Sequence, residues 1–252
     1  MGFKEIYEEG LINSKKQIVE TSNLSSKPIL ITGIISPESK ICINPSNEVT
    51  FELDKKGMEK IIGMFQDRWN VLSDEERKNL MHVLREIFLL TQEYLGGIGN
   101  PAVRLHAYEH AKNLCLSLSE IEGKQIGLCA ERAAIGHQLL SILEQTGILN
   151  FESYLTNSYI TTKEMRPHAF IVLKHHKDES KQFIFDIENP IEYHLNGKTV
   201  QGIALYSMTK EEYKDFINGK NISPKNVLEQ IGISALGEKR AYGNEYQKER
   251  TD

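Results

Sequence analysis

The segment CAERAAIGHQLLSILEQT, residues 129–146, limits the possible folds of this chain more than any other feature. Its Ala133, Leu140 and Leu143 recur at helical spacing, and Gly147 provides a typical helix end. The first turns are apolar nearly all round, which is typical of a helix that is covered on every side. We therefore expect a central, buried helix with the rest of the chain packed around it.

Three strand-like runs follow this helix. They cover residues 151–160 (FESYLTNSYI), 168–175 (HAFIVLKH) and 181–187 (KQFIFDI), and a short charged turn joins the last two. A further strand is expected near residues 199–205, followed by two short helices near 210–217 and 224–231. A buried helix against an antiparallel sheet is an α+β fold, and this is the fold class that the sequence predicts.

The N-terminal half divides differently. Residues 1–27 hold few apolar positions in any period and are expected to form a loosely attached lead. Residues 28–120 read as a β meander up to residue 54, then as a helical block whose third helix runs from about 100 to 119. Residues 121–235 form the expected core, and the polar tail 236–252 is expected to be disordered. Residues 28–235 are expected to make one compact domain.

Composition narrows the function classes. The net charge of −5 provides no basic surface for nucleic acid or anionic lipid, so neither partner is expected. No run approaches the roughly 18 apolar residues of a membrane span, and the acidic N-terminus does not resemble a signal peptide. Three cysteines cannot form a disulfide framework and suit a reducing compartment. These features together favour a cytoplasmic protein.

Cys129 stands at the start of the buried helix, where the helix dipole favours a thiolate. A nucleophilic thiol needs a base and a group that orients the base, and His168 and Asp186 follow on neighbouring strands. If residues 168–175 and 181–187 pair as a hairpin in which Leu173 faces Gln182, His168 falls within one residue of Asp186. The sequence therefore predicts a catalytic triad of these three residues.

Each of these residues also has a structural interpretation. A free cysteine is among the most often buried residue types, and Asp186 alternatively caps the turn before Asn189. Gln125 and the backbone N–H of Cys129 are candidate donors for an oxyanion, although the charged loop around Gln125 favours a solvated amide there. Glu131 and Arg132 are expected to form an ion pair, and His137 is expected to be structural.

A second constellation lies on the predicted third helix. His106 and His110 are four residues apart, a spacing at which two histidines chelate one metal, and Cys115 follows. Cys115 points to another face of the helix, and Glu109 is not at the position that a zincin motif requires. We expect no metal and no cofactor, with a metal-binding regulatory domain as the weakest alternative.

Several local patterns together resemble the transglutaminase-like superfamily, a branch of the papain-like thiol enzymes. They are Gly-Leu-Cys at residues 127–129, His-Ala-Phe at 168–170, and Phe-Asp-Ile-Glu-Asn-Pro at 185–190. The resemblance covers about residues 121–195 and implies a papain-like core with Cys129, His168 and Asp186 as nucleophile, base and orienting acid. Ala130 replaces the tryptophan of animal transglutaminases, so calcium-dependent cross-linking is not implied. Leu128 and Ala130 likewise depart from arylamine acetyltransferases, so acetyl-CoA use is not implied.

The function predicted on these grounds is thiol-dependent acyl chemistry on a carboxamide or ester. A cysteine peptidase, an amidase or deamidase, and an acyl transferase all fit, and the substrate is expected to be a peptide or protein. The alternative from another class is a non-catalytic peptide- or protein-binding module on the same fold. The sequence leaves the acyl acceptor and the oligomeric state open.

Overall fold

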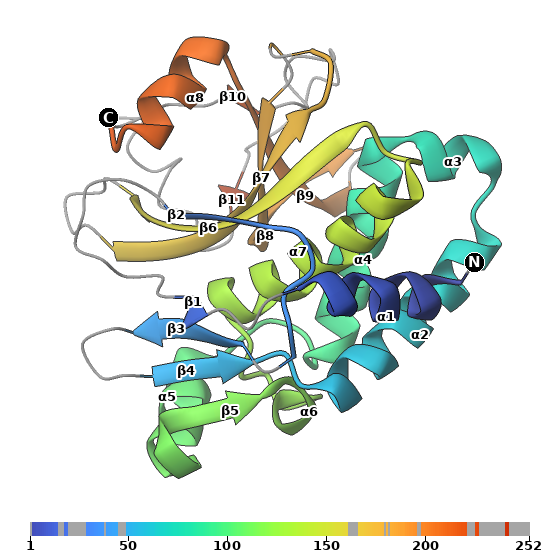
Figure 1. The fold of residues 1–252 in the computed structure, drawn as a ribbon. Coiled ribbons are helices and arrows are strands. Elements are labelled where there is room, and N and C mark those ends of the chain that lie inside the picture. Colours follow the sequence, from blue (N-terminus) through green and yellow to red (C-terminus); the bar gives the residue numbers. More distant parts are fainter. Residues whose placement is uncertain are drawn as a thin grey trace.

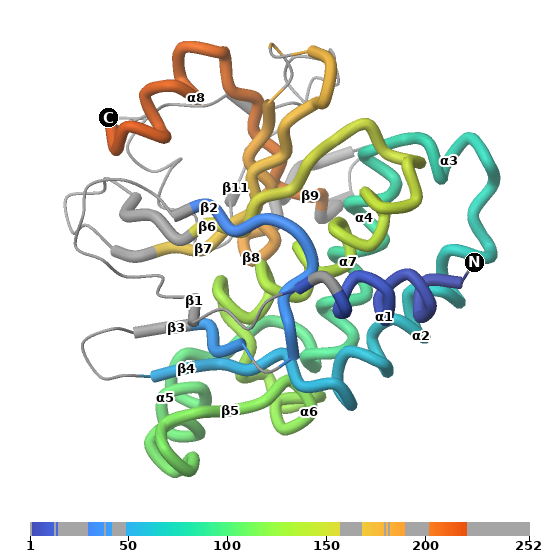
Figure 2. Tube along the Cα trace, viewed as in Figure 1, coloured from blue at the N-terminus to red at the C-terminus, as the bar shows by residue number. Residues whose placement is uncertain are grey.

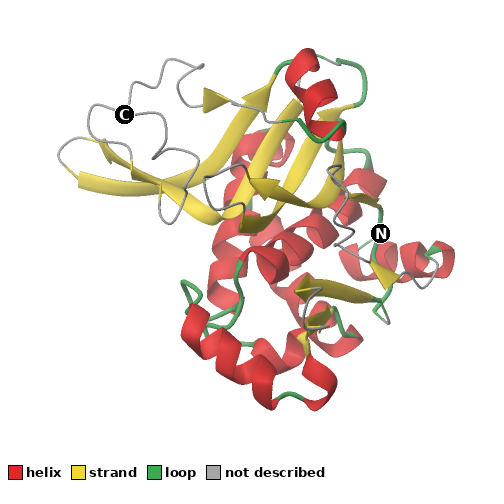
Figure 3. Ribbon diagram, turned by 90° about the vertical axis from the view of Figure 1, so that its left-hand side faces the viewer, coloured by secondary structure: helices red, strands yellow, loops and turns green. Residues whose placement is uncertain are grey.

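The computed structural model describes residues 2–14, 18–19, 29–37, 39–44, 49–160, 166–178, 180, 182–195, 198–220, 225–226 and 240–241. Over these residues the chain is a mixed α+β structure with helices packed on an antiparallel sheet, as predicted (Figures 1 and 2). In Figure 3 the larger sheet and the main group of helices form two layers, with one short helix on the opposite side of the sheet.

The larger sheet is seven-stranded and antiparallel in all of its described pairs. Its strand order is β10-β9-β8-β7-β6-β2, and β11 pairs with β8. The strands are β2 (Ile29–Thr32), β6 (Phe151–Ile160), β7 (Arg166–His175), β8 (Gln182–Leu195), β9 (Lys198–Met208), β10 (Lys225–Asn226) and β11 (Arg240–Ala241). The predicted strands after the buried helix are therefore all present as neighbours. The short helix predicted near residues 224–231 is wrong where the structure describes it, because Lys225 and Asn226 form β10 and pair with β9.

The smaller sheet lies below the larger one in Figure 1. Its order is β1-β3-β4-β5, with parallel pairs at the two ends and an antiparallel pair in the middle. The strands are β1 (Ile18–Val19), β3 (Lys40–Asn44), β4 (Val49–Glu52) and β5 (Cys115–Ser117). β5 comes from a distant part of the chain, so this sheet closes the N-terminal half on itself.

The meander predicted over residues 28–54 is confirmed in its three strands and wrong in the pairing of the first one. Only β3 and β4 pair with each other, whereas β2 joins the edge of the larger sheet, where Ile31 lies opposite Leu155 of β6. Ile31 and Leu155 are both buried in the main core. The position of an edge strand depends on the hydrophobic surface that it buries. The sequence of β2 alone therefore does not specify β6 as its partner.

Helix α7 (Cys129–Thr146) lies between the larger sheet and other helices. Strands β6, β7 and β8 cover one side of α7, while α1 and α4 pack on it from the other side. The remaining helices are α1 (Phe3–Asn13), α2 (Lys55–Val71), α3 (Asp74–Lys78), α4 (Leu80–Tyr94), α5 (Pro101–His110), α6 (Leu118–Ile121) and α8 (Lys210–Ile217), with a 3₁₀ turn η2 (Lys112–Leu114).

Helix α7 is buried as its sequence predicts. Every residue from Ala130 to Leu143 is buried, including the polar ones. The helix ends at Gly147, whose φ of 68° is the left-handed conformation that glycine adopts without strain. A helix enclosed in this way holds its first residue, Cys129, in a fixed position relative to the sheet.

The predicted third helix is shorter than expected. Asn100 caps it, with its side chain accepting from the backbone of Ala102 and Val103, but the helix ends at His110. Asn113 and Leu114 then adopt left-handed φ values of 57° and 51°. After this turn the chain forms β5, which pairs with β4. Cys115 therefore lies on a strand and not on the helix of His106 and His110.

The lead at residues 1–27 is packed where the structure describes it, which corrects the prediction. Phe3 and Tyr7 of α1 are buried, and the ring of Phe3 stacks on Phe65 at 5.3 Å between centroids. The contact partners on α2 lie far away in sequence, so the local pattern did not reveal them.

One core cluster runs from α1 through α7 to β9, across the expected division at residue 120, as one compact domain requires. The predicted disordered tail, 236–252, lies outside the described residues except for β11.

Candidate active site

Cys129 begins α7 and is reached through a loop that leaves little freedom. Gly99 and Gly127 approach so closely that a β carbon on Gly99 would lie 2.3 Å from the carbonyl oxygen of Gly127. The backbone of Gln125 donates to Leu95 at 2.9 Å and accepts from Asn100 at 2.8 Å. The loop before α7 is therefore bonded to the segment between α4 and α5, and this fixes where the thiol starts.

Two buried charged residues in the first turn of α7 strengthen this arrangement. Glu131 is fully buried and accepts from Arg104 at 2.8 Å, from Tyr108 at 2.8 Å, and from the backbone of Leu128 at 3.1 Å. The predicted ion pair between Glu131 and Arg132 is therefore wrong, because Glu131 pairs with Arg104 of α5. This carboxylate ties α5 to the N-terminus of α7.

Arg132 instead binds backbone carbonyls. Its Nε donates to Gly127 at 3.0 Å, and its Nη2 donates to Gly97. Burial lowers the pKa of Arg132, while Glu188 and Glu131 oppose that shift. The guanidinium thus joins the two loops that flank the start of α7.

His168 and Asp186 are in direct contact. The Nε2 of His168 lies 2.9 Å from Oδ2 of Asp186, and both side chains are buried. Because the carboxylate accepts, Nε2 carries the proton and Nδ1 is the nitrogen left for another partner. This is the contact that the hairpin prediction anticipated.

The register that produces the contact differs from the predicted one. Leu173 lies opposite Phe183 and not Gln182, a shift of one residue. Continued past Ile171 and Phe185, the observed register places Asp186 opposite Phe170, two residues from His168 and therefore on the same face of the sheet. The predicted register would have placed the two side chains on opposite faces.

Asp186 also caps the turn that follows it. Its Oδ1 accepts from the backbone N–H groups of Glu188 and Asn189 at 3.2 and 3.3 Å, and its Oδ2 accepts from the Asn189 side chain at 3.0 Å. The two interpretations of Asp186 from the sequence are thus both met by one side chain. The turn coincides with a shift of register between β8 and β9, so the strand is interrupted where the carboxylate is needed.

The electrostatics of the pair favour charge separation. Burial opposes protonation of His168, but the attraction of Asp186 outweighs it, and contact with Cys129 adds to this, so the pKa of the imidazole is raised well above its ordinary value. Burial alone would raise the pKa of Asp186, yet the charge and hydrogen bond of His168 lower it. An imidazolium held between a carboxylate and a thiol is the form that these shifts favour.

Cys129 lies next to the same imidazole. A donor atom from each of Cys129, His168 and Glu188 lies within 4.8 Å of the other two. Helix α7 and strands β7 and β8 each contribute one of these residues. The three residues of the predicted triad are therefore assembled at one place, from segments up to 57 positions apart in the sequence.

Glu188 was not singled out from the sequence. Its Oε2 lies 3.7 Å from Nδ1 of His168, and its side chain is about a quarter exposed. Burial raises the pKa of Glu188, while the imidazolium of His168 opposes this shift. The signal in the sequence is the Asp186-x-Glu188 spacing, because residues two apart on a strand share a face.

Gln125, the other predicted oxyanion donor, has a less direct place. It is exposed and adopts a left-handed φ of 56°, and its hydrogen bonds to Leu95 and Asn100 are made by its backbone. The backbone N–H groups in the first turn of α7, including that of Cys129, have no hydrogen-bond partner within the helix. They are therefore the better candidate donors to an oxyanion.

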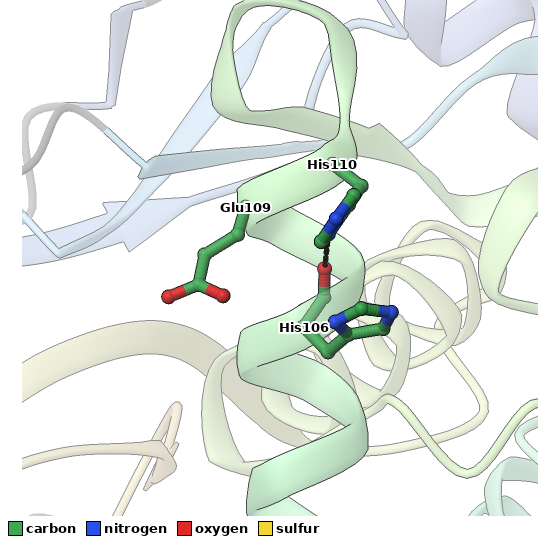
Figure 4. Close-up of side chains that lie close together, drawn as sticks. All are labelled: His106, Glu109 and His110. Carbon is green, nitrogen blue, oxygen red and sulfur yellow. Dashed lines mark hydrogen bonds between the residues drawn. The ribbon is translucent and has the colours of Figure 1, made fainter.

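The alternative metal constellation lies elsewhere and has changed its members. His106, Glu109 and His110 cluster on the exposed surface of α5 (Figure 4), whereas Cys115 has left this set for β5. The Nδ1 of His110 is already bonded to the carbonyl of His106 at 2.8 Å. The cluster is separate from Cys129, and its three residues are exposed.

Three kinds of comparison with known proteins found no match. No family model matches the chain, and no curated protein and no solved structure does so either. Within the described residues, no helix has both the length and the apolar character needed to cross a bilayer. What can be inferred about function therefore rests on the residues themselves.

Proposed function

We propose that this chain is a cysteine hydrolase or acyl transferase with a papain-like core of the transglutaminase-like type, acting on a carboxamide or ester of a peptide or protein. The observation that carries the proposal is the line of contacts from Asp186 through the His168 ring to Cys129. A nucleophile, a base and a group that orients the base are the minimum set for such chemistry.

The reaction follows from the roles of these atoms. The sulfur of Cys129 attacks the carbonyl carbon, and His168 then gives its Nδ1 proton to the departing nitrogen or oxygen. The acyl group remains on Cys129 as a thioester. Water or an amine next attacks this thioester while His168 takes its proton. The carbon–sulfur bond then breaks, which releases the acyl product and regenerates Cys129. Asp186 holds the imidazole tautomer throughout, because its oxygen binds the opposite ring nitrogen.

The residues around Cys129 hold the thiol and the nearby backbone N–H groups in place before a substrate binds. The N–H groups of the first turn of α7 lie beside the thiol, where they suit the oxygen that becomes negative during attack. Glu131 and Arg132 fix this turn to neighbouring loops through buried hydrogen bonds. A nucleophile held in this way has little reorganisation to make when the substrate binds. A cytoplasmic location accords with the need to keep the thiol reduced.

A small activated ester tests the proposal without knowledge of the natural substrate. We expect p-nitrophenyl acetate to release nitrophenolate in a burst and to leave one acetyl group on Cys129, located by mass spectrometry of the digested chain. The variant His168→Ala should slow this acylation by about a hundredfold or more. Cys115→Ser is the matched control and should acylate like the native chain.

The opposite result favours the binding module. If the acetyl group is found on Cys42 or Cys115, or if His168→Ala acylates as fast as the native chain, the contacts around Cys129 do not activate a nucleophile. The protein is then better described as a non-catalytic peptide- or protein-binding module, the alternative that the sequence leaves open.

A further inference from the structure

The donor atoms beside the thiol form a set that the proposed acyl chemistry does not fully use. Cys129 provides a sulfur, His168 its Nδ1, and Glu188 a carboxylate oxygen, all within 4.8 Å of one another. The nitrogen and the carboxylate are 3.7 Å apart. Bonds of about 2.0–2.3 Å at a tetrahedral zinc ion place its ligand atoms roughly 3.3–3.7 Å apart. The distance between nitrogen and carboxylate already falls in this range, and the sulfur lies no more than 4.8 Å from either.

The neighbouring contacts have the arrangement that supports a metal ligand. A metal-bound histidine usually donates its other ring N–H to a carboxylate, which fixes the ring and increases its basicity. His168 donates Nε2–H to Asp186, and Asn189 in turn donates to Asp186. The side chain of His168 is about one-tenth exposed, so its ring is held in place before any ion arrives.

The ligand types select the metal. A thiolate, an imidazole and one carboxylate suit zinc, whereas calcium and magnesium prefer oxygen ligands alone. Three protein ligands leave a fourth tetrahedral position for water or for a substrate carbonyl. The exposed cluster of His106, Glu109 and His110 lacks a thiolate and a buried partner for its rings, so it is the weaker set (Figure 4).

We propose that Cys129, His168 and Glu188 bind one Zn²⁺ ion, which blocks the thiol reversibly. This inference rests on the proposed function for its consequence, since a zinc-bound sulfur cannot attack a carbonyl. The binding itself does not depend on catalysis. Glu188 thereby has a role separate from the triad, as the third ligand of an inhibitory ion.

Direct zinc binding provides the first test. The full chain, freed of metal, is titrated with Zn²⁺ in competition with a chromophoric chelator. We expect one ion per chain, and Glu188→Gln should weaken the affinity by at least about tenfold, since it removes a ligand charge. Cys129→Ser should abolish the tight site. The double variant His106→Ala with His110→Ala is the matched control and should bind like the native chain.

Protection of the thiol provides a second test that does not depend on any variant folding correctly. Zn²⁺ at one equivalent should slow alkylation of Cys129 by iodoacetamide in the native chain by at least about tenfold, and a chelator should restore the rate. An equal concentration of Ca²⁺ or Mg²⁺ should leave the rate unchanged.

The outcomes separate this proposal from the proposed function. Zinc binding that survives Cys129→Ser, or that disappears in the His106 and His110 double variant, overturns the zinc site while leaving acylation of Cys129 untouched. Unchanged alkylation in the presence of Zn²⁺ overturns it equally. Zinc binding that depends on Cys129 and Glu188 in a chain that p-nitrophenyl acetate does not acylate retains the site and overturns the catalytic function instead.

Discussion

Asp186 accepts the Nε2–H of His168 at 2.9 Å from a diagonal position of the hairpin, and not from the position directly opposite. The pairing of Ile171 with Phe185, continued by one residue, places Asp186 opposite Phe170. Phe170 is two residues from His168 on β7, so the side chains of His168 and Asp186 lie on the same face of the sheet. A register slip of one residue would turn the two side chains to opposite faces. The charge state of the site thus depends on the pairing of β7 with β8.

Replacement of Asp186 by asparagine should lower the acylation rate by about a hundredfold or more while the chain stays folded. The amide keeps the volume and accepts the turn hydrogen bonds, but it no longer fixes Nε2 as the protonated nitrogen. Burst kinetics with p-nitrophenyl acetate and a thermal melt measure the two effects. Asp215→Asn on α8, which removes a surface contact with Lys220, is the control and should react normally. Native rates in Asp186→Asn would remove this residue from the triad.

Cys129 should be the first thiol alkylated by iodoacetamide at mildly acidic pH. The sulfur of Cys129 lies beside the ring of His168, which can take its proton, whereas Cys115 lies half-buried on β5. His168→Ala should slow this reaction strongly and leave the labelling of Cys115 unchanged. Peptide mapping after short exposure identifies the modified residue. Prior modification of Cys115 in the folded chain would contradict an activated Cys129.

His137 should make the fold sensitive to acid. It is fully buried, and its Nε2–H donates to the carbonyl of Gly33 at 3.0 Å while Nδ1 accepts from Ser153 at 3.1 Å. Burial lowers the pKa of His137 from 6.5 to about 4. The unfolded chain therefore binds a proton at a higher pH than the folded chain does. The resulting loss of stability begins as the pH falls below about 6.5 and is complete below about 4, where it reaches about 3 kcal/mol.

His137→Gln tests this assignment, because the amide occupies a similar place and does not titrate. Urea unfolding at several pH values between 7 and 4 should show a shallower decline of the free energy of unfolding in the variant than in the native chain. His106→Gln on exposed α5 is the control and should retain the native slope. Equal slopes in all three chains would place the acid sensitivity elsewhere.

Arg104→Met should destabilise the fold by about 3 kcal/mol, because it leaves the carboxylate of Glu131 buried without its charge partner. The double variant with Glu131→Gln should be less destabilised than the sum of the two single variants, since no lone charge remains. Denaturant unfolding measures each free energy. Arg68→Met is the matched control: its ion pairs with Glu86 and Glu93 are more exposed, and it should cost less than about 1 kcal/mol. Equal costs at the two arginines would contradict the importance of burial here.

The sequence by itself determined the features that depend on neighbouring residues. The apolar residues spread around the first turns of segment 129–146 predicted a buried helix, and Gly147 predicted its end, because helix periodicity and capping are local properties. The strand-like runs at residues 168–175 and 181–187, joined by a short charged turn, predicted two paired strands with His168 and Asp186 at adjoining ends. The placement of Cys129 at a helix start followed from the same local reasoning.

Only the tertiary structure decided which distant surfaces meet. The attachment of β2 to β6, the pairing of Glu131 with Arg104, and the packing of α1 on α2 join segments that no local pattern relates. The exact register of β7 and β8, and with it the approach of Glu188 to His168, also required the folded chain. Such contacts are selected by the burial of whole surfaces and by the pairing of charges inside them, and these free energies depend on every element at once.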